Sequence, residues 1–560
     1  MTRNLLAVLS VLFAFAANAE ESKLPVPDEM QTCLGCHDGS DKAVPAVDVQ
    51  AFLKSWHQQN GQLKVGCTDC HKGYTMGPHD AEGPALSDAD KAIVAKLATV
   101  TLPGKITSPR ALLSCADCHD GPAAALQGSI HSKWLGEAGA KAPGPTCVAC
   151  HGSPHALVKL AAYSPHDGKR EKVPADRRAI HERCAACHGN EEFAKAAGLP
   201  TEVVARYDDS IHGREVRVGN AYAPACTSCH SANVGGSHGI VSKTSAASSV
   251  SAQQKKETCG RCHAGATANF AKLIAHKEPQ DVSGHIVPHV THMAFSWLTT
   301  LTLLFFAFHV LIDFVYELRM RLSKSHHAAG DDDVKTVVRF DIHQRAQHWF
   351  MLSGVILLGV TGWPLRGAGA AQAVGASKAL FRIFGGAEGA ALWHRVGAVL
   401  IIISALYHLF YLTFLAAQKR LPFSMLPTPK DAMDMKDNIL FMLGVKKDRP
   451  KFERYMYLEK FDYWAVFWGI VMMVGTGFVY WFPVFFANYA PHWLIGATQI
   501  IHGEEATLAI LFLFTVHFYN VHLKPSIFPM NWAWLNGRIT VGMLKHEHPV
   551  EYERLKKDIK

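Results

Sequence analysis

Residues 33–37 read Cys-Leu-Gly-Cys-His, and this C-x-x-C-H pattern returns six more times before residue 264. The seven copies use all 14 Cys of the chain. Two thiols at this spacing add to the two vinyl groups of a haem, and the following histidine supplies an imidazole to its iron. The pattern therefore predicts seven c-type haems. The predicted attachment cysteines are Cys33, Cys36, Cys67, Cys70, Cys115, Cys118, Cys147, Cys150, Cys184, Cys187, Cys226, Cys229, Cys259 and Cys262, and the predicted proximal ligands are His37, His71, His119, His151, His188, His230 and His263.

Zinc binding and disulfide bonds are the two other uses of paired cysteines. Zinc knuckles do not require a histidine after every second Cys, whereas all seven pairs here have one. The same regularity favours haem over disulfides, which an oxidising compartment would permit. The net charge of +8 is modest for 560 residues, so a nucleic-acid-binding protein is not indicated.

The second axial ligand of each iron is expected among the other histidines of the same half, because bis-histidine haems are six-coordinate electron carriers. A Ser-x-His triplet at 55–57, 129–131 and 210–212 shortly precedes the second, fourth and sixth C-x-x-C-H motifs, and a further His follows each of these motifs. The odd-numbered motifs recur at a nearly constant interval, as do the even-numbered ones, which predicts three dihaem modules plus one terminal haem. The candidate distal ligands are His57, His79, His131, His155, His212, His238 and His276, with His285 as the alternative to His276.

An export signal opens the chain. Arg3 precedes an apolar run over residues 5–17, and Ala-Asn-Ala at 17–19 fits a cleavage site; the alternative is an uncleaved membrane anchor. Export places residues 20–290 in the periplasm. This half is rich in Gly, Ala and Pro and has few apolar runs, so we expect an irregular multihaem c-type domain of short helices and loops with a haem-filled core.

The second half contains five apolar stretches long enough to cross a bilayer about 30 Å thick. The segments after the first, third and fifth stretches hold 23 Lys and Arg, whereas the two other connecting segments hold three. Because positive residues favour the cytoplasmic side, the C-terminus is expected in the cytoplasm and the haem domain outside. An all-α transmembrane bundle of five helices is therefore predicted. The stretches are about 293–316, 346–365, 392–415, 462–482 and 499–522.

Histidines inside apolar helices are costly unless they bind something. His394 and His408 lie 14 residues apart on one stretch, roughly 21 Å along a helix axis. His502 and His517 lie 15 residues apart on another, roughly 22 Å. Both spacings approach four helical turns, so each pair nearly returns to one helix face. Two such helices facing each other can hold two stacked b haems, and this spacing pairs His408 with His517.

The membrane half also carries sequence motifs. Asp341-Ile-His-Gln-Arg-Ala-Gln-His348-Trp349 opens a helix that ends at Thr361-Gly362, and His394-Arg-Val-Gly397, Ile501-His502 and His517 follow. Over roughly 335–545 these motifs resemble the cytochrome b (gamma) subunit of membrane formate dehydrogenases and nickel–iron hydrogenases. The resemblance implies an outer haem b held by His394 and His502 and an inner haem b held by His348 and His517. This chain adds His408, which leaves His408 as the alternative inner ligand.

Glu504 and Glu505 are a second departure from that family pattern, near the outer end of the last stretch. They are candidate catalytic residues that accept quinol protons on the periplasmic side. The alternative is that they lie at the interface, hydrogen-bonded or solvated. His309 and Asp313 on the first stretch are equally open, and this extra helix is expected to tie the two halves together.

The fusion of a multihaem c domain to a dihaem b domain resembles the inner-membrane cytochrome bc quinone oxidoreductases of metal-respiring bacteria. The resemblance implies an enzyme of the bacterial inner membrane that passes electrons from menaquinol through two b haems and seven c haems to a periplasmic acceptor. Its partners are then the quinone pool, periplasmic cytochromes or other carriers and the lipid bilayer, and no nucleic acid. The alternatives are the same path in reverse, a terminal reductase of a nitrogen or sulfur oxyanion, and a subunit that only anchors a partner oxidoreductase.

The sequence divides into five predicted regions. They are a signal peptide at 1–19, a periplasmic heptahaem domain at 20–290, a linking transmembrane helix with a cytoplasmic linker at 291–335, a dihaem cytochrome b membrane domain at 336–545 and a cytoplasmic tail at 546–560.

Overall fold

The computed structural model describes most of the chain, which divides into two compact units. The units are residues 1–202 with 224–254, and residues 203–223 with 255–560. The segment 1–19 and the histidines His79 and His155 lie outside the described residues. The described residues are 28–40, 42, 46–59, 65–71, 115–131, 147–152, 174–217, 219–220, 222–230, 238–273, 276, 282–323, 335–366, 379–420 and 423–557.

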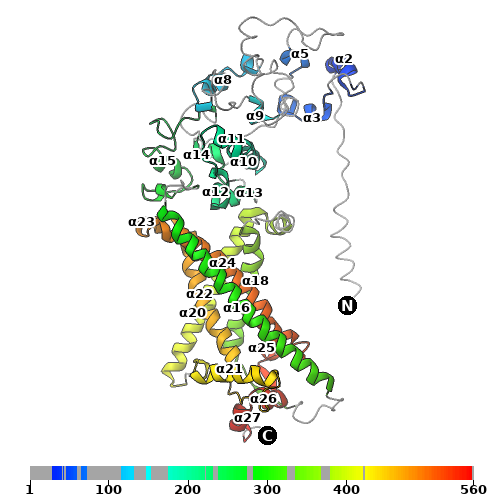
Figure 1. Ribbon diagram of the computed structural model, residues 1–560, viewed down its shortest axis with the longest axis vertical. Coiled ribbons are helices and arrows are strands. Elements are labelled where there is room, and N and C mark those ends of the chain that lie inside the picture. Colours follow the sequence, from blue (N-terminus) through cyan, green and yellow to red (C-terminus); the bar gives the residue numbers. More distant parts are fainter. Residues whose placement is uncertain are drawn as a thin grey trace. The chain divides into compact units, whose positions relative to one another are not determined.

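The described residues of the first unit form short helices and contain no strand (Figure 1). Local caps start several of these helices. The Asp48 carboxylate accepts a hydrogen bond from the Ala51 amide at 3.0 Å, and the Asn190 side chain accepts one from the Phe193 amide at 2.9 Å. The helices are α2 (Asp28–His37), α3 (Val49–Leu53), α4 (Trp56–Gln59), α5 (Cys67–Cys70), α7 (Cys115–Cys118), α8 (Asp120–Gln127), α9 (Cys147–His151), α10 (Pro174–His188), α11 (Glu191–Ala196) and α14 (Cys226–His230).

Five long apolar helices dominate the second unit and confirm the predicted helix bundle (Figure 1). They are α16 (Val282–Ser323), α18 (Ile342–Leu365), α20 (Gly386–Ala417), α22 (Tyr457–Trp481) and α24 (His492–Phe512). α18 packs along α20, and α24 packs along both α16 and α22. The start of α18 is set by Asp341, whose carboxylate accepts a hydrogen bond from the Gln344 amide at 2.9 Å while the Gln344 side chain accepts one from the Asp341 amide at 3.0 Å.

Glycines allow α18 and α20 to approach closely. A Cβ added at Gly354 would lie 2.8 Å from Ile401 Cδ1, and one added at Gly397 would lie 3.0 Å from Leu358 Cγ. Within a bilayer, helices associate through such close packing of small residues rather than through the hydrophobic effect. The two helices that carry His348 and His394 are therefore held firmly against each other.

Smaller elements complete the second unit. Val337 of β1 (Thr336–Val338) aligns with Ile539 of β2 (Arg538–Thr540) in an antiparallel pair. Figure 1 shows α21 (Pro429–Met442) lying across the end of the bundle that also carries the C-terminal helices. The remaining elements are α12 (Val203–Asp209), α13 (Ile211–Arg217), α15 (Lys255–Gly260), η6 (Phe270–Lys272), η7 (Phe423–Met425), α23 (Pro483–Tyr489), the π-helical turns η8 (Leu513–His517) and η9 (Tyr519–Leu523), α25 (Ala533–Asn536), α26 (Val541–Glu547) and α27 (Pro549–Leu555).

Candidate haem sites

Each of the seven C-x-x-C-H segments lies on a short helix or at its end. In three of them the histidine amide donates to the carbonyl of the first cysteine at 2.9 Å, which closes one helical turn over the motif. Such a turn keeps two thiols and an imidazole close together, as attachment to one haem requires. No disulfide joins the 14 Cys, all of which are described. Among the described residues no three His, Cys, Asp or Glu side chains converge as they do in a zinc site.

The motifs lie together in consecutive pairs. The first cysteine of an odd-numbered motif hydrogen-bonds to the first cysteine of the next motif, so the two attachment turns are neighbours. Motifs one to six form three such pairs. The pairs are Cys33 with Cys67, Cys115 with Cys147, and Cys184 with Cys226.

Four motif histidines face a second histidine ring. An imidazole nitrogen lies about 2 Å from a metal ion, so two imidazoles on opposite sides of one iron have ring centroids roughly 6 Å apart. The observed separations agree with this geometry. They are 6.3 Å for His57–His119, 6.4 Å for His131–His188, 5.8 Å for His151–His238 and 6.1 Å for His212–His263.

The serine of the Ser-x-His triplet has a structural role. The Ser210 hydroxyl accepts a hydrogen bond from the Gly213 amide at 3.1 Å and donates to the Tyr207 carbonyl at 2.6 Å, which caps the helix that carries His212. Ser129 accepts a hydrogen bond from the His131 amide at 3.2 Å. In these two triplets the serine therefore fixes the backbone that presents the imidazole.

Burial keeps these imidazoles in the form that binds iron. Burial, with a smaller effect of the neighbouring His188 and His263, lowers the pKa of His131 and of His212 to about 4. Both rings are thus neutral at physiological pH, and a neutral imidazole nitrogen is a metal ligand. Of the other distal candidates, His276 follows η6 in the described chain, and nothing is established of the side chain of His285.

Two further histidine pairs lie inside the bundle. His394 of α20 faces His502 of α24 at 6.4 Å between ring centroids, and His348 of α18 faces His517 of η8 at 6.5 Å. α18 and α20 are consecutive helices packed side by side, so they run in opposite directions. His348 and His394 each lie near the start of their helix, and the two pairs therefore lie toward opposite ends of the bundle. This is the separation that two stacked b haems need.

Hydrogen bonds to the second ring nitrogen orient these imidazoles. His394 Nδ1 lies 3.0 Å from Thr361 Oγ1, and His502 Nδ1 lies 2.8 Å from Thr476 Oγ1. His517 Nδ1 lies 2.6 Å from Asp462 Oδ2. In each case Nε2 is left for iron, which is how metal-binding histidines are positioned in proteins. The sequence motifs did not indicate Thr476 or Asp462 as partners of the histidines. An acidic residue within an apolar stretch is the feature that could have indicated Asp462.

Small residues next to the rings leave space for a flat cofactor. A Cβ added at Gly362 would lie 3.1 Å from His394 Cε1, and one at Gly477 would lie 3.5 Å from His502 Cε1. A Cβ added at Gly475 would meet no atom within 4 Å. His348 Nδ1 is buried and has no hydrogen-bond partner. The opposed rings fit a haem at each pair, and the glycines beside His394 and His502 add space for one at the outer pair.

His408, the alternative inner ligand, points elsewhere. Its Nδ1 lies 2.9 Å from Gln347 Oε1 and its Nε2 lies 2.8 Å from the Tyr463 hydroxyl. Both ring nitrogens are therefore occupied by side chains, whereas His517 faces His348. The helical spacing correctly placed His408 inside the bundle, but the structure brings it to a polar contact instead of a second histidine.

Glu504 and Glu505 have different surroundings. Glu504 Oε1 lies 3.0 Å from Arg366 Nη2 and 3.5 Å from His292 Nδ1, so it belongs to an ion-pair cluster near an end of the bundle. Glu505 is 5 % exposed, and its Oε2 has no hydrogen-bond partner. A Cβ added at Gly469 of α22 would lie 3.4 Å from Glu505 Oε1. Glu504 is thus held in ion pairs, whereas Glu505 is buried with one carboxylate oxygen unpartnered.

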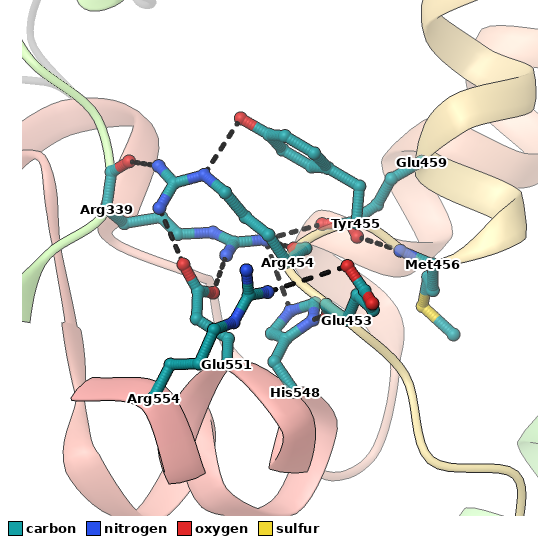
Figure 2. A network of polar contacts seen from close by, with 9 residues as sticks. All are labelled: Arg339, Glu453, Arg454, Tyr455, Met456, Glu459, His548, Glu551 and Arg554. Carbon is teal, nitrogen blue, oxygen red and sulfur yellow. Dashed lines mark hydrogen bonds and ion pairs between the residues drawn. The ribbon is translucent and has the colours of Figure 1, made fainter. Parts of the chain in front are cut away.

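A buried network fastens the C-terminal helices to the membrane helices (Figure 2). Arg339 precedes α18, and its Nη1 donates to Glu551 Oε2 at 2.7 Å. Arg454 precedes α22; it donates to Glu551 Oε1 at 2.6 Å and to the Arg339 carbonyl at 2.6 Å. His548 Nδ1 lies 2.8 Å from the Glu453 carbonyl. Buried charges persist only when they are paired in this way, so α27 is tied to the starts of two membrane helices.

A helical bundle that holds opposed histidines at both ends is the architecture of a membrane cytochrome b. Residues 339–530 match the family model described as prokaryotic cytochrome b561. The match supports a haem b-binding, electron-transferring membrane part, and it begins after α16. No curated protein was similar enough in sequence to be matched to this chain.

Proposed function

We propose that this chain is a membrane quinol:cytochrome c-type oxidoreductase that passes electrons from menaquinol through two b haems and seven c haems to a periplasmic acceptor. The observation that supports the proposal is the set of six opposed histidine pairs, two in the bundle and four among residues 57–263. Bound haem supplies one-electron chemistry at each pair. The two imidazoles of each pair would hold the haem between them, and Thr361, Thr476 and Asp462 orient His394, His502 and His517 in the bundle.

The six pairs also favour electron transfer over terminal reduction. A reductase of a nitrogen or sulfur oxyanion needs an iron with an open position. Four of the seven motif histidines already face a second imidazole. Electron paramagnetic resonance of the oxidised protein distinguishes the two functions: the proposal expects only low-spin haem, and a stoichiometric high-spin signal supports the reductase.

The direct test uses the purified holoprotein and a menaquinol analogue. We expect the b absorption bands and then the c bands to be reduced. A chain that only anchors a partner would show no quinol-dependent reduction of its c haems. Reduction by an external donor followed by quinone reduction would establish the reverse direction, which uses the same residues. Quinol oxidation is preferred because of the resemblance to the cytochrome bc oxidoreductases.

His517→Ala tests the inner pair. Because His517 faces only His348 and the outer pair is separate, one b haem should be lost and the other retained. The c haems should then no longer be reduced if menaquinol enters beside the inner pair. Loss of both b haems, or of neither, contradicts the pairing. His408→Ala is the matched control and should retain both b haems.

A further inference from the structure

The first membrane helix carries a buried column of ionisable side chains that the electron path leaves unused. His309, Asp313 and Glu317 occur at every fourth residue of α16, so they share one helix face. They are 2 %, 6 % and 5 % exposed, respectively. Ionisable groups at such depth are costly to insert, and they line ion or proton pathways where they occur. α16 lies outside residues 339–530, so the cytochrome b561 match does not account for the column.

The column continues to the end of the bundle that carries the C-terminal helices. Asp313 Oδ1 lies 3.7 Å from Lys524 Nζ, which lies 3.7 Å from Glu317 Oε1 and 3.8 Å from Glu547 Oε1 of α26. These distances exceed a direct hydrogen bond and are those of ion pairs. Carboxyl groups thus follow one another from α26 into α16.

The inner end of the column reaches the neighbourhood of the inner histidine pair. The Tyr519 hydroxyl donates to Asp313 Oδ2 at 2.7 Å, and Tyr519 lies two residues after His517. His309 Nε2 lies 2.7 Å from the Tyr457 hydroxyl. From His309 to Glu317 the column covers eight residues of α16, roughly 12 Å. Tyr457 is the first residue of α22, so the column reaches from the end of the bundle to the level of the first turn of α22.

The charges of the cluster do not balance. Burial opposes the charge of Glu547, yet Lys524 and other cations keep its pKa below the usual value. Burial lowers the pKa of His546 and leaves it neutral. Three carboxyls, Asp313, Glu317 and Glu547, face the two cations Lys524 and Arg449.

We propose that this column conducts protons between the α26 end of the bundle and the bilayer interior beside the inner histidine pair, and that it serves the quinone reaction. The proposal rests on the proposed quinone function. Oxidation of one quinol yields quinone, two electrons and two protons. The electrons leave toward a one-electron acceptor on the side of the C-x-x-C-H motifs, and both protons leave through Asp313 and Glu317 to the opposite side. In the reverse direction the same side chains deliver two protons to quinone.

The test uses the holoprotein in liposomes that contain a trapped pH-sensitive dye. A menaquinol analogue is the donor, ferricyanide outside is the membrane-impermeant acceptor, and valinomycin with potassium dissipates the potential. Only molecules with their c haems outside reduce ferricyanide. We expect two protons in the lumen for every two ferricyanide ions reduced. Ferricyanide reduction without lumenal acidification overturns the column as the proton path, whereas absence of any ferricyanide reduction contradicts the proposed function itself.

Variants then assign the protons to the column. Asp313→Asn keeps a hydrogen-bond acceptor for Tyr519 but cannot carry a proton, so quinol turnover should fall roughly 100-fold with both b haems retained. Asp313→Glu should restore it. Asp437→Asn is the matched control. Asp437 of α21 lies at the same end of the bundle and pairs with Lys446 at 2.7 Å, outside the column, so this variant should be fully active. Full activity of Asp313→Asn overturns the proposal. If Asp313→Asn does not assemble, the number of lumenal protons released by the wild-type protein in the dye assay decides for or against the proposal.

Discussion

Hydrogen bonds to the ring nitrogens determine how His517 and His408 are oriented in the bundle. His517 is held by the Asp462 carboxylate, and His408, nine residues short of the end of α20, is held by Gln347 and Tyr463 on both sides. The two histidines look equivalent in the sequence because both lie inside apolar stretches. Their hydrogen-bond partners, which are remote in the sequence, distinguish the two rings. His517 bonds to Asp462 through one nitrogen, whereas His408 is bonded to side chains through both.

Asp462→Asn tests the orienting carboxylate. The amide keeps a hydrogen-bond acceptor but removes the charge that makes the His517 imidazole more basic. We expect the affinity for the inner b haem to fall 10- to 100-fold and its reduction potential to rise. Haem content and redox titration of the b bands measure both. Thr476→Ser, which keeps the hydroxyl bonded to His502, is the control; an inner potential equal to that of the wild type contradicts the role of Asp462.

The carboxyl group of Glu215 on α13 should make the stability of the folded protein depend on pH. Burial raises the pKa of this carboxyl to about 7, Arg395 opposes the rise and Glu388 adds to it. A raised folded-state pKa stabilises the protein below the unfolded value near 4.5, and this stability is lost as the pH rises through 7. Up to roughly 3 kcal/mol is involved. Glu215→Gln should remove this loss, so its melting midpoint should exceed the wild-type value at pH 8 but not at pH 5.

Among the short helices, the Ser-x-His triplets connect distant motifs. Each triplet histidine faces the histidine of the second C-x-x-C-H motif after it, not of the next one: His57 passes over His71 and faces His119. His131 and His212 follow the same rule with His188 and His263. The sequence identified the triplets as candidate ligands, but it did not predict their partners, because the short spacing favoured the nearer motif. Haem ligation at these pairs would therefore connect each proposed module to the next.

His57→Met tests this rule in the holoprotein. The rule expects the variant to perturb the haem at Cys115 and Cys118, and the change should appear as one altered species in the electron paramagnetic resonance spectrum. The double variant Cys115→Ala/Cys118→Ala removes that haem. In this background His57→Met should add no further change. A change that persists there assigns His57 to the haem at Cys67 and Cys70 and refutes the rule.

At the scale of the whole molecule, the helix bundle could be predicted from the sequence, but the short helices that pack with it could not. Apolar length and flanking charge predicted five membrane helices, and all five are present. Packing, however, groups α12 and α13 with residues 255–560, although they precede the sixth motif in sequence. α13 carries His212, which faces His263, and its Glu215 interacts with Arg395, the neighbour of His394. One short helix thus connects the last c-type motif to the outer histidine pair, a relation that local sequence patterns do not encode.

The orientation of the whole chain is the remaining prediction, and it decides the electrical meaning of the proposed reaction. If the Lys- and Arg-rich segments lie in the cytoplasm, electrons leave outward while protons leave inward, so quinol oxidation consumes membrane potential. If all 14 Cys form haem thioethers, as proposed, no native thiol reacts. A membrane-impermeant maleimide should therefore label Lys556→Cys, just after α27, in inverted vesicles but not in spheroplasts. Tyr489→Cys, 79 % exposed on α23, should show the opposite labelling. The reverse pattern for both would place the C-terminus outside and turn the same chemistry into one that conserves energy.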